Sequence, residues 1–155
     1  MKNFFLFLLL LSFIALPLYA ASEDELKLAH KMLGEAAKTS NFDLLVPMIH
    51  PQALGFMRES QMVVQLGSWS GVREILPPLL VDLSRFLVTP YETTYRVIGG
   101  TGIVCMTINA KPIAVDPKTK KKGEERYSRA TYVYTKTDSG WKLLAWHTSE
   151  TPLKK

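Results

Sequence analysis

The residue types best suited to holding a ligand occur near the end of the chain, in residues 127–149. Large side chains alternate there with a period of two, as they do along a β-strand. On one face this alternation collects ring and hydroxyl groups, namely Tyr132, Tyr134, Trp146 and Thr148. It leaves His147 on the other face. Such a surface suits a small, mostly apolar ligand with a polar end, but the same rings are equally compatible with a plain hydrophobic core, and both interpretations stay open.

Histidine and cysteine offer other kinds of chemistry. The chain has three histidines and one cysteine. His50 precedes Pro51, a position more typical of a helix end than of a general base. Cys105 lies in an apolar stretch, where we expect it to be a small buried hydrophobe. One cysteine can form no internal disulfide, and no ligand spacing accompanies it, so the sequence predicts neither a metal site nor a cofactor.

Two alternating blocks, Tyr127–Lys136 and Trp141–Ser149, carry the ligand-type residues. They are joined by Thr137–Gly140, whose small polar residues and glycine are typical of a tight reversal, so a β-hairpin is predicted. Both faces of the hairpin carry large side chains, which indicates helices on one side and a partner chain on the other. We expect a homodimer built sheet to sheet through Thr131, Val133, Trp141, Leu143 and Ala145.

The first twenty residues read as a secretory signal peptide. Lys2 gives a basic start, Phe4–Leu18 is almost wholly apolar, and small residues follow at Ala20-Ala21. We expect cleavage after Ala20, a periplasmic or secreted protein, and no stable membrane anchor afterwards. An uncleaved anchor is the lesser alternative. Residues 21–155 are about the size of a single domain.

The charge of the chain argues against a nucleic-acid partner. Lysine and arginine number 19 against 14 acidic residues, a formal net charge of +5. The excess is concentrated in residues 118–122 and in the closing Lys154-Lys155. A solvated loop explains such a local surplus better than a nucleic-acid surface does.

Helices are predicted in the first part of the domain. Apolar residues recur every three or four positions up to Ala37, and Ser22 three residues before Glu25 is typical of a capping box. Asn41 then caps a second short helix, Phe42–Ile49.

The middle of the chain is less regular. Ala53–Arg58 and Gln61–Leu66 are compatible with two short strands, although a helix explains the second almost as well. Val72–Leu87 is predicted to be a longer helix, which Pro77-Pro78 must kink or split.

Long strands are predicted to follow. Tyr91–Ile98 leads to a turn at Gly99-Gly100, and a second strand runs from Gly102 to about Val115 before the final hairpin. Helices first and then four consecutive strands indicate an α+β fold, with helices laid across one face of a curved antiparallel sheet.

The order of these elements resembles the nuclear transport factor 2-like superfamily, and within it the SnoaL-like proteins and the association domain of calmodulin-dependent kinase. The resemblance covers about Glu23 to Glu150. The segments that carry it are Asn41-Phe42-Asp43 to His50-Pro51, Gly71-Val72-Arg73-Glu74, Asp138-Ser139-Gly140-Trp141 and Trp146-His147-Thr148-Ser149. It implies a cone-shaped α+β barrel with a four- to six-stranded, mostly antiparallel sheet and a pocket under the helices.

The resemblance implies several site positions. A ketosteroid isomerase base and oxyanion holder would fall near Met57 and Leu33, which cannot act in those roles. An aspartate–histidine pair of the dehydratase type could draw only on Asp43, His50 and His147.

The association-domain resemblance implies a different set of pocket positions. The pocket arginines of that domain match Asn109, Tyr132 and Thr148, and none of these is arginine. The same register would bring Thr107 to the cavity, while Arg96 and Arg129 could lie at its mouth or outside it. The predicted ligand-binding residues are Asn109, Tyr132, Tyr134, Trp146 and Thr148.

Two functions from different classes are compatible with these residues. The leading hypothesis is an exported, non-catalytic domain that binds a small apolar ligand or serves in assembly. The alternative is a SnoaL-like isomerase, cyclase or hydrolase acting on a small hydrophobic substrate. An ionisable group in the cavity with an orienting partner would distinguish them.

Overall fold

The computed structural model describes residues 22–56, 63–65, 86–115, 120 and 122–151. The signal-peptide prediction, residues 72–85 of the predicted third helix and most of the lysine run lie outside this part of the chain. The elements in chain order are α2 (Glu23–Lys38), α3 (Phe42–Leu45), the 3₁₀ turn η1 (Val46–Met48), β1 (Ile49–Phe56), β2 (Val63–Gln65), β3 (Phe86–Ile98), β4 (Thr101–Pro112), β5 (Arg126–Thr137) and β6 (Gly140–Thr151). Of the helices in the described residues, none has the length and apolar character needed to cross a membrane.

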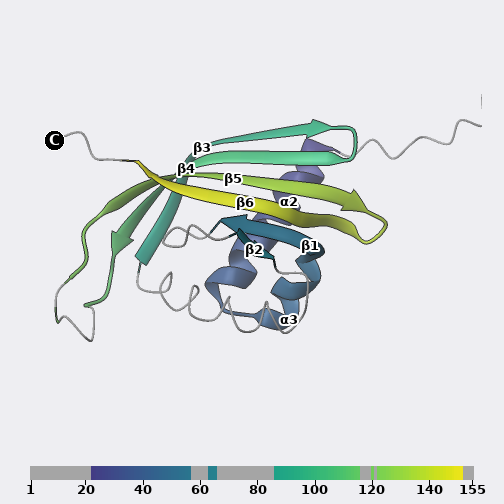
Figure 1. Cartoon of the computed structure of the whole chain (residues 1–155). Coiled ribbons are helices and arrows are strands. Elements are labelled where there is room, and N and C mark those ends of the chain that lie inside the picture. The colour runs from purple at the N-terminus through teal and green to yellow at the C-terminus, as the bar shows by residue number, and fades with distance from the viewer. Residues whose placement is uncertain (1–21, 57–62, 66–85, 116–119, 121, 152–155) are drawn as a thin grey trace, which may run out of the picture.

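Within the described residues, six strands form one mixed sheet in the order β2-β1-β6-β5-β4-β3. β1 runs parallel to β6 and every other neighbouring pair is antiparallel. Both helices lie on the same side of the long strands (Figure 1). The predicted α+β class, with N-terminal helices on a mostly antiparallel sheet, is confirmed.

The first two helices begin where capping chemistry predicts. The Ser22 hydroxyl accepts a hydrogen bond from the Glu25 backbone N–H at 3.1 Å, and the Asn41 side chain accepts one from Leu44 N–H at 3.2 Å. The second helix is shorter than predicted, because Pro47 lies in a 3₁₀ turn and Ile49 already belongs to β1. His50 is therefore a strand residue and not a helix end.

The sequence predicted the strand ends next to the turns closely, and the strand ends far from the turns less well. Gly99 and Gly140 have positive φ in the two hairpin turns, a conformation that glycine adopts without steric cost. β2 confirms the strand interpretation of the segment around Val63–Gln65. Phe86 and Leu87, predicted as the end of a helix, begin β3 instead.

A bulge in the final hairpin changes which side chains face the core. Val133 pairs with Ala145 but Tyr134 pairs with Leu143, so Leu144 is an extra residue in β6. The extra residue brings Trp141 and Leu143 to the same face as Trp146. Trp141 and Leu143 are 5% and 4% exposed, so placing them on an outward dimer face was wrong.

The core lies between the helices and the concave face of the sheet. α2 approaches β4 so closely at Gly102 that a Cβ there would lie 2.7 Å from Leu26 Cδ1. The buried apolar residues are Leu26, Leu33, Ala36, Leu45, Val46, Ala53, Val104, Met106, Ala130, Tyr134, Trp141 and Leu143.

The prediction that Cys105 is buried was also wrong. Val104 and Met106 face the core, so alternation along β4 directs the intervening Cys105 to the opposite face, where it is exposed. Its sulfur lies 3.9 Å from the Thr131 hydroxyl.

Candidate functional site

A histidine on α2 hydrogen-bonds a tyrosine from the middle of the sheet. His30 follows Leu26 by four residues and precedes Leu33 by three, so helical periodicity puts all three on the core-facing side. His30 Nδ1 lies 2.7 Å from the hydroxyl oxygen of Tyr134, a residue that is 1% exposed. This contact joins helix and sheet through a polar pair inside an otherwise apolar interface.

Three tyrosine rings surround the imidazole of His30. The distances from its ring centroid are 4.9 Å to Tyr132, 5.9 Å to Tyr134 and 6.1 Å to Tyr95, each with an edge-on geometry. Tyr95 and Tyr132 both pair with Val104 across neighbouring strands, which fixes them on the same face. We call His30, Tyr95, Tyr132 and Tyr134 the His30 cluster.

Burial favours the uncharged forms of His30, Tyr132 and Tyr134. Desolvation lowers the pKa of His30 from 6.5 to about 4, so the imidazole is neutral at pH 7. Desolvation also raises the pKa of Tyr132 and of Tyr134 above the usual phenol value. Because a neutral imidazole nitrogen is a good acceptor, we assign Tyr134 O–H as the donor to His30 Nδ1, which leaves the His30 proton on Nε2.

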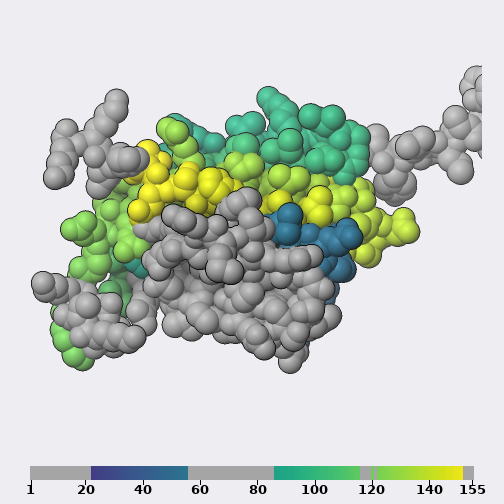
Figure 2. Space-filling model, in the orientation of Figure 1, coloured from purple at the N-terminus to yellow at the C-terminus, as the bar shows by residue number. Residues whose placement is uncertain are grey.

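Trp146 extends the aromatic surface toward β1. It pairs with Tyr132 on one side and with Gly55 on the other. A Cβ on Gly55 would lie 2.1 Å from Trp146 Cζ2, so only glycine leaves room for the indole there. Figure 2 shows the surface of β6 beside that of β1.

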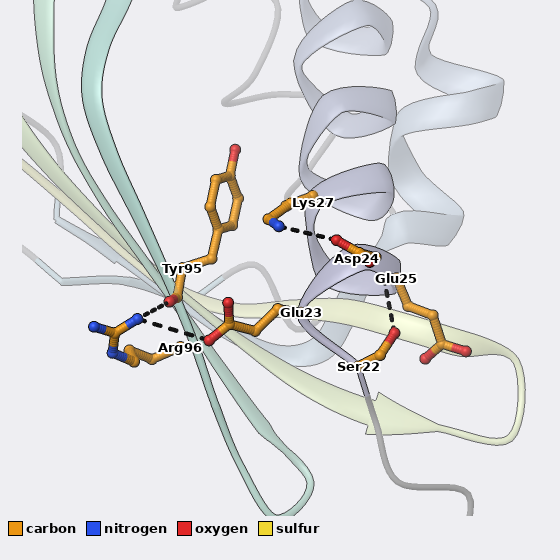
Figure 3. Close-up of polar contacts among 7 residues, drawn as sticks. All are labelled: Ser22, Glu23, Asp24, Glu25, Lys27, Tyr95 and Arg96. Carbon is orange, nitrogen blue, oxygen red and sulfur yellow. Dashed lines mark hydrogen bonds and ion pairs between the residues drawn. The ribbon is translucent and has the colours of Figure 1, made fainter.

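Ion pairs fix the first turns of α2 over the sheet. Glu25 Oε2 lies 2.6 Å from Lys136 Nζ on β5, and this contact lowers the pKa of Glu25. At the sheet edge, Arg96 lies 3.7 Å from Glu23 and donates to the Tyr95 carbonyl oxygen at 2.9 Å (Figure 3). Arg96 is exposed and paired with the helix start, so it does not line the His30 cluster.

Four of the five predicted ligand-binding residues share the helix-facing side of the sheet. Tyr132 pairs with Trp146, and Thr148 pairs with the buried Ala130. The fifth, Asn109, lies on the opposite face, so grouping it with the others was wrong. Their ligand binding remains a prediction.

Asn109 belongs to a separate polar group on the outward face. It pairs with Tyr127 and donates to Glu125 Oε1 at 2.6 Å. Thr107 also faces outward, and Arg129 beside it is exposed. The register of β4 explains both errors, because its even-numbered residues face the core.

Sequence reasoning did not identify His30 as a site residue. The ring and hydrogen-bond contacts described for His30 do not involve Asp43, His50 or His147, which the sequence offered for acid–base chemistry. Asp43 is exposed on α3, His50 accepts from Gln52 N–H at 3.1 Å in β1, and His147 is exposed on β6. One signal was available, since His30 interrupts the apolar stripe at helical spacing from Leu26 and Leu33. In the described part of the chain, no three His, Cys, Asp or Glu side chains gather as metal ligands would.

Comparisons with known proteins agree with this architecture. The model of the SnoaL-like domain family matches residues 29–154. No curated protein matches the chain. A proposed dehydratase of the NTF2-like family from Streptomyces avermitilis is similar in structure, with a TM-score of 0.67 and 19% identity over 83% of this chain and 95% of that one.

Two further solved structures are similar to the same extent. A proposed ketosteroid isomerase from Shewanella frigidimarina has a TM-score of 0.65 and 18% identity, over 78% of this chain and 91% of that one. The CaMKII hub of S. rosetta has a TM-score of 0.67 and 17% identity, over 85% and 98% respectively. At these identities the comparisons show the fold, which is the expected NTF2-like cone, and not an activity.

Proposed function

The chain belongs to the SnoaL-like domain family, and on this basis we propose that it is an exported, non-catalytic domain that binds a small, mostly apolar ligand with a polar end. The observation that carries the proposal is the His30 cluster. It places polar atoms among aromatic rings on the helix-facing side of the sheet. Pockets that bind small molecules have this composition, with mostly apolar walls and a few fixed polar groups.

A purely structural role explains the His30 cluster less well. Burying a histidine and a tyrosine between helix and sheet costs desolvation free energy that an apolar pair would avoid. Their hydrogen bond recovers only part of this cost. Contact with a ligand explains why the polar groups of His30 and Tyr134 lie between helix and sheet.

Ligand binding can be tested by NMR on residues 21–155. Titration with a set of small neutral aromatic and alicyclic compounds is expected to shift amide signals of α2, β5 and β6 around the His30 cluster. Tyr91→Ala, on the outward face of β3, is the control and should leave these shifts unchanged. Mass spectrometry of the bound compounds should show no conversion. Shifts confined to the outward face, or none at all, contradict the proposal.

Export has its own test. The full chain, produced in a bacterial host and recovered from the periplasm or medium, should begin at Ala21 when its amino terminus is sequenced. Recovery of an exported chain that begins at Met1 would reject cleavage.

We further propose that the outward face of the sheet joins two copies of the chain. Of the predicted interface residues, Thr131, Val133 and Ala145 keep their outward position, and Ile103 extends the apolar row as the partner of Val133. Structural relatives include the CaMKII hub and association domains. Light scattering should give twice the mass of one chain, and Val133→Glu should give a folded monomer. A monomeric wild-type protein at micromolar concentration contradicts this proposal.

The alternative function is enzymatic, and the state of His30 is the observation that favours it. In the tautomer assigned above, the neutral imidazole of His30 presents Nε2–H, which can donate to a substrate oxygen on which negative charge develops. Two relatives are proposed as a dehydratase and a ketosteroid isomerase. If a substrate of either class is converted, His30→Gln should abolish turnover while the fold survives. Conversion that persists in this variant would exclude His30 from the chemistry.

A further inference from the structure

The connection between β4 and β5 forms an arm at one end of the sheet. We define the β4–β5 arm as residues 111–115 and 122–126. Its two sides run antiparallel and pair at Val115 and Lys122. In Figure 1 the arm lies apart from α2 and α3, at the end of the sheet opposite the turn between β5 and β6. Neither of these helices covers it.

Aliphatic side chains on and beside the β4–β5 arm are exposed. Gly123 packs on Phe86, since a Cβ on this glycine would lie 3.8 Å from Phe86 Cζ. The aliphatic residues around that contact stay outside it: Leu87 is 53% exposed, Ile113 61% and Val115 55%. A single exposed side chain of this kind is common, but three gathered at one end of a sheet indicate a contact surface.

The same end of the sheet carries the positive charge of the protein. Residues 111–126 contain six basic and three acidic side chains, and the closing Lys154-Lys155 adds two further positive charges. These two segments account for the whole formal excess of five. β6 ends at Thr151, whose partner Tyr127 directly follows the arm. The β4–β5 arm is therefore the basic end of the molecule.

The lysines of the arm differ from the basic side chains at the opposite end of the sheet, which form ion pairs with the first turn of α2. On the arm, the charge of Lys111 helps to lower the pKa of Glu125. Lys120 and Lys122 are exposed and take part in no ion pair among the described residues. They can bind an external anion without giving up a partner.

From this arrangement we propose that the β4–β5 arm binds the surface of an anionic lipid bilayer. Basic side chains attract acidic lipid headgroups, while aliphatic side chains beside them enter the boundary between headgroups and acyl chains. An acidic protein fits less well, because the described part of the arm forms a projection and not a groove that could enclose a peptide. The contact is peripheral and reversible, and it does not depend on ligand binding at the His30 cluster.

Co-sedimentation with lipid vesicles tests the proposal on residues 21–155. This chain contains every residue of the described core and lacks Phe4–Leu18, which is apolar enough to bind lipid itself. It should bind vesicles of equimolar phosphatidylcholine and phosphatidylglycerol, and bind pure phosphatidylcholine vesicles more weakly. Raising the salt concentration should weaken binding to the anionic vesicles, because salt screens the headgroup charge.

Matched lysine variants test the charged part of the surface. The double variant Lys120→Gln, Lys122→Gln should weaken binding to the anionic vesicles by about fivefold for each lysine removed. The double variant Lys31→Gln, Lys38→Gln makes the same change of charge on exposed positions of α2 and should weaken binding far less. Equal weakening by the two double variants would show that net charge alone is responsible, and would overturn the proposal.

Matched isoleucine variants test the apolar part. Ile113→Ser should weaken binding to the anionic vesicles by about three- to tenfold, because its side chain leaves water on binding. Ile98→Ser alters a side chain that is 69% exposed at the other end of the sheet, and it should leave binding unchanged.

The remaining outcomes also decide the question. No binding to the anionic vesicles, or equal binding to the neutral ones, overturns the proposal. Binding to soluble polyglutamate as strong as to vesicles, with no effect of Ile113→Ser, indicates an acidic protein partner and overturns it as well.

Discussion

Acid should destabilise this protein through His30 before it affects the carboxylates. The folded chain holds His30 neutral with a pKa of about 4, whereas an unfolded histidine titrates at 6.5. As the pH falls below 6.5, His30 becomes protonated in the unfolded chain but stays neutral in the folded chain. The free energy of unfolding therefore decreases. With about 1.36 kcal/mol per pKa unit, the loss between about pH 7.5 and about pH 4.5 is about 2.5 kcal/mol.

Urea unfolding at several pH values measures this loss. His30→Gln removes the titrating group and should flatten the pH dependence over that range, while His147→Gln, altered on the exposed face, should retain it. Hydrogen bonds from Lys136 and Asn109 lower the pKa of Glu25 and of Glu125 respectively, and their contribution to the pH dependence is the same in all three proteins. Stability that is constant from pH 7.5 to 4.5 in the wild type, or an equal slope in His30→Gln, would refute the assigned burial of His30.

Four other substitutions probe the packing around the cluster. Trp146→Ala should lower the free energy of unfolding by about 3 to 5 kcal/mol, and His147→Ala, at an exposed position, should lower it by less than Trp146→Ala does; reversed magnitudes in urea unfolding would mean that the strand register is wrong. Gly55→Ala should cost about 1 to 3 kcal/mol because its methyl group meets the Trp146 ring, and a neutral result would place that ring elsewhere. Tyr134→Phe should cost about 0.5 to 1.5 kcal/mol, and an unaltered His30 pKa and stability would deny the hydrogen bond.

Local chemistry predicted the parts of the fold that depend on nearby residues. Ser22 and Asn41 cap helices because their side chains reach backbone N–H groups three residues ahead, and the sequence alone shows that spacing. The turns at Gly99 and Gly140 follow from the backbone freedom of glycine.

Features set by distant contacts were not predictable in this way. The extra residue Leu144 follows Leu143, so the apolar residues of β6 do not show where the alternation between the two faces breaks. β4 has apolar residues at successive positions, and only its pairing with β5 reveals that Val104 faces inward and Asn109 outward. His30 acquires its role from Tyr134, which lies 104 residues further along the chain.

The most direct test of the central claim is to locate a bound probe by nuclear Overhauser effects on residues 21–155 saturated with acetophenone, a small neutral aromatic compound. The proposed binding site predicts contacts from the probe to ring protons of the His30 cluster. Contacts to the outward face, for example to Tyr91, or the absence of any contact between the probe and the His30 cluster, would contradict it.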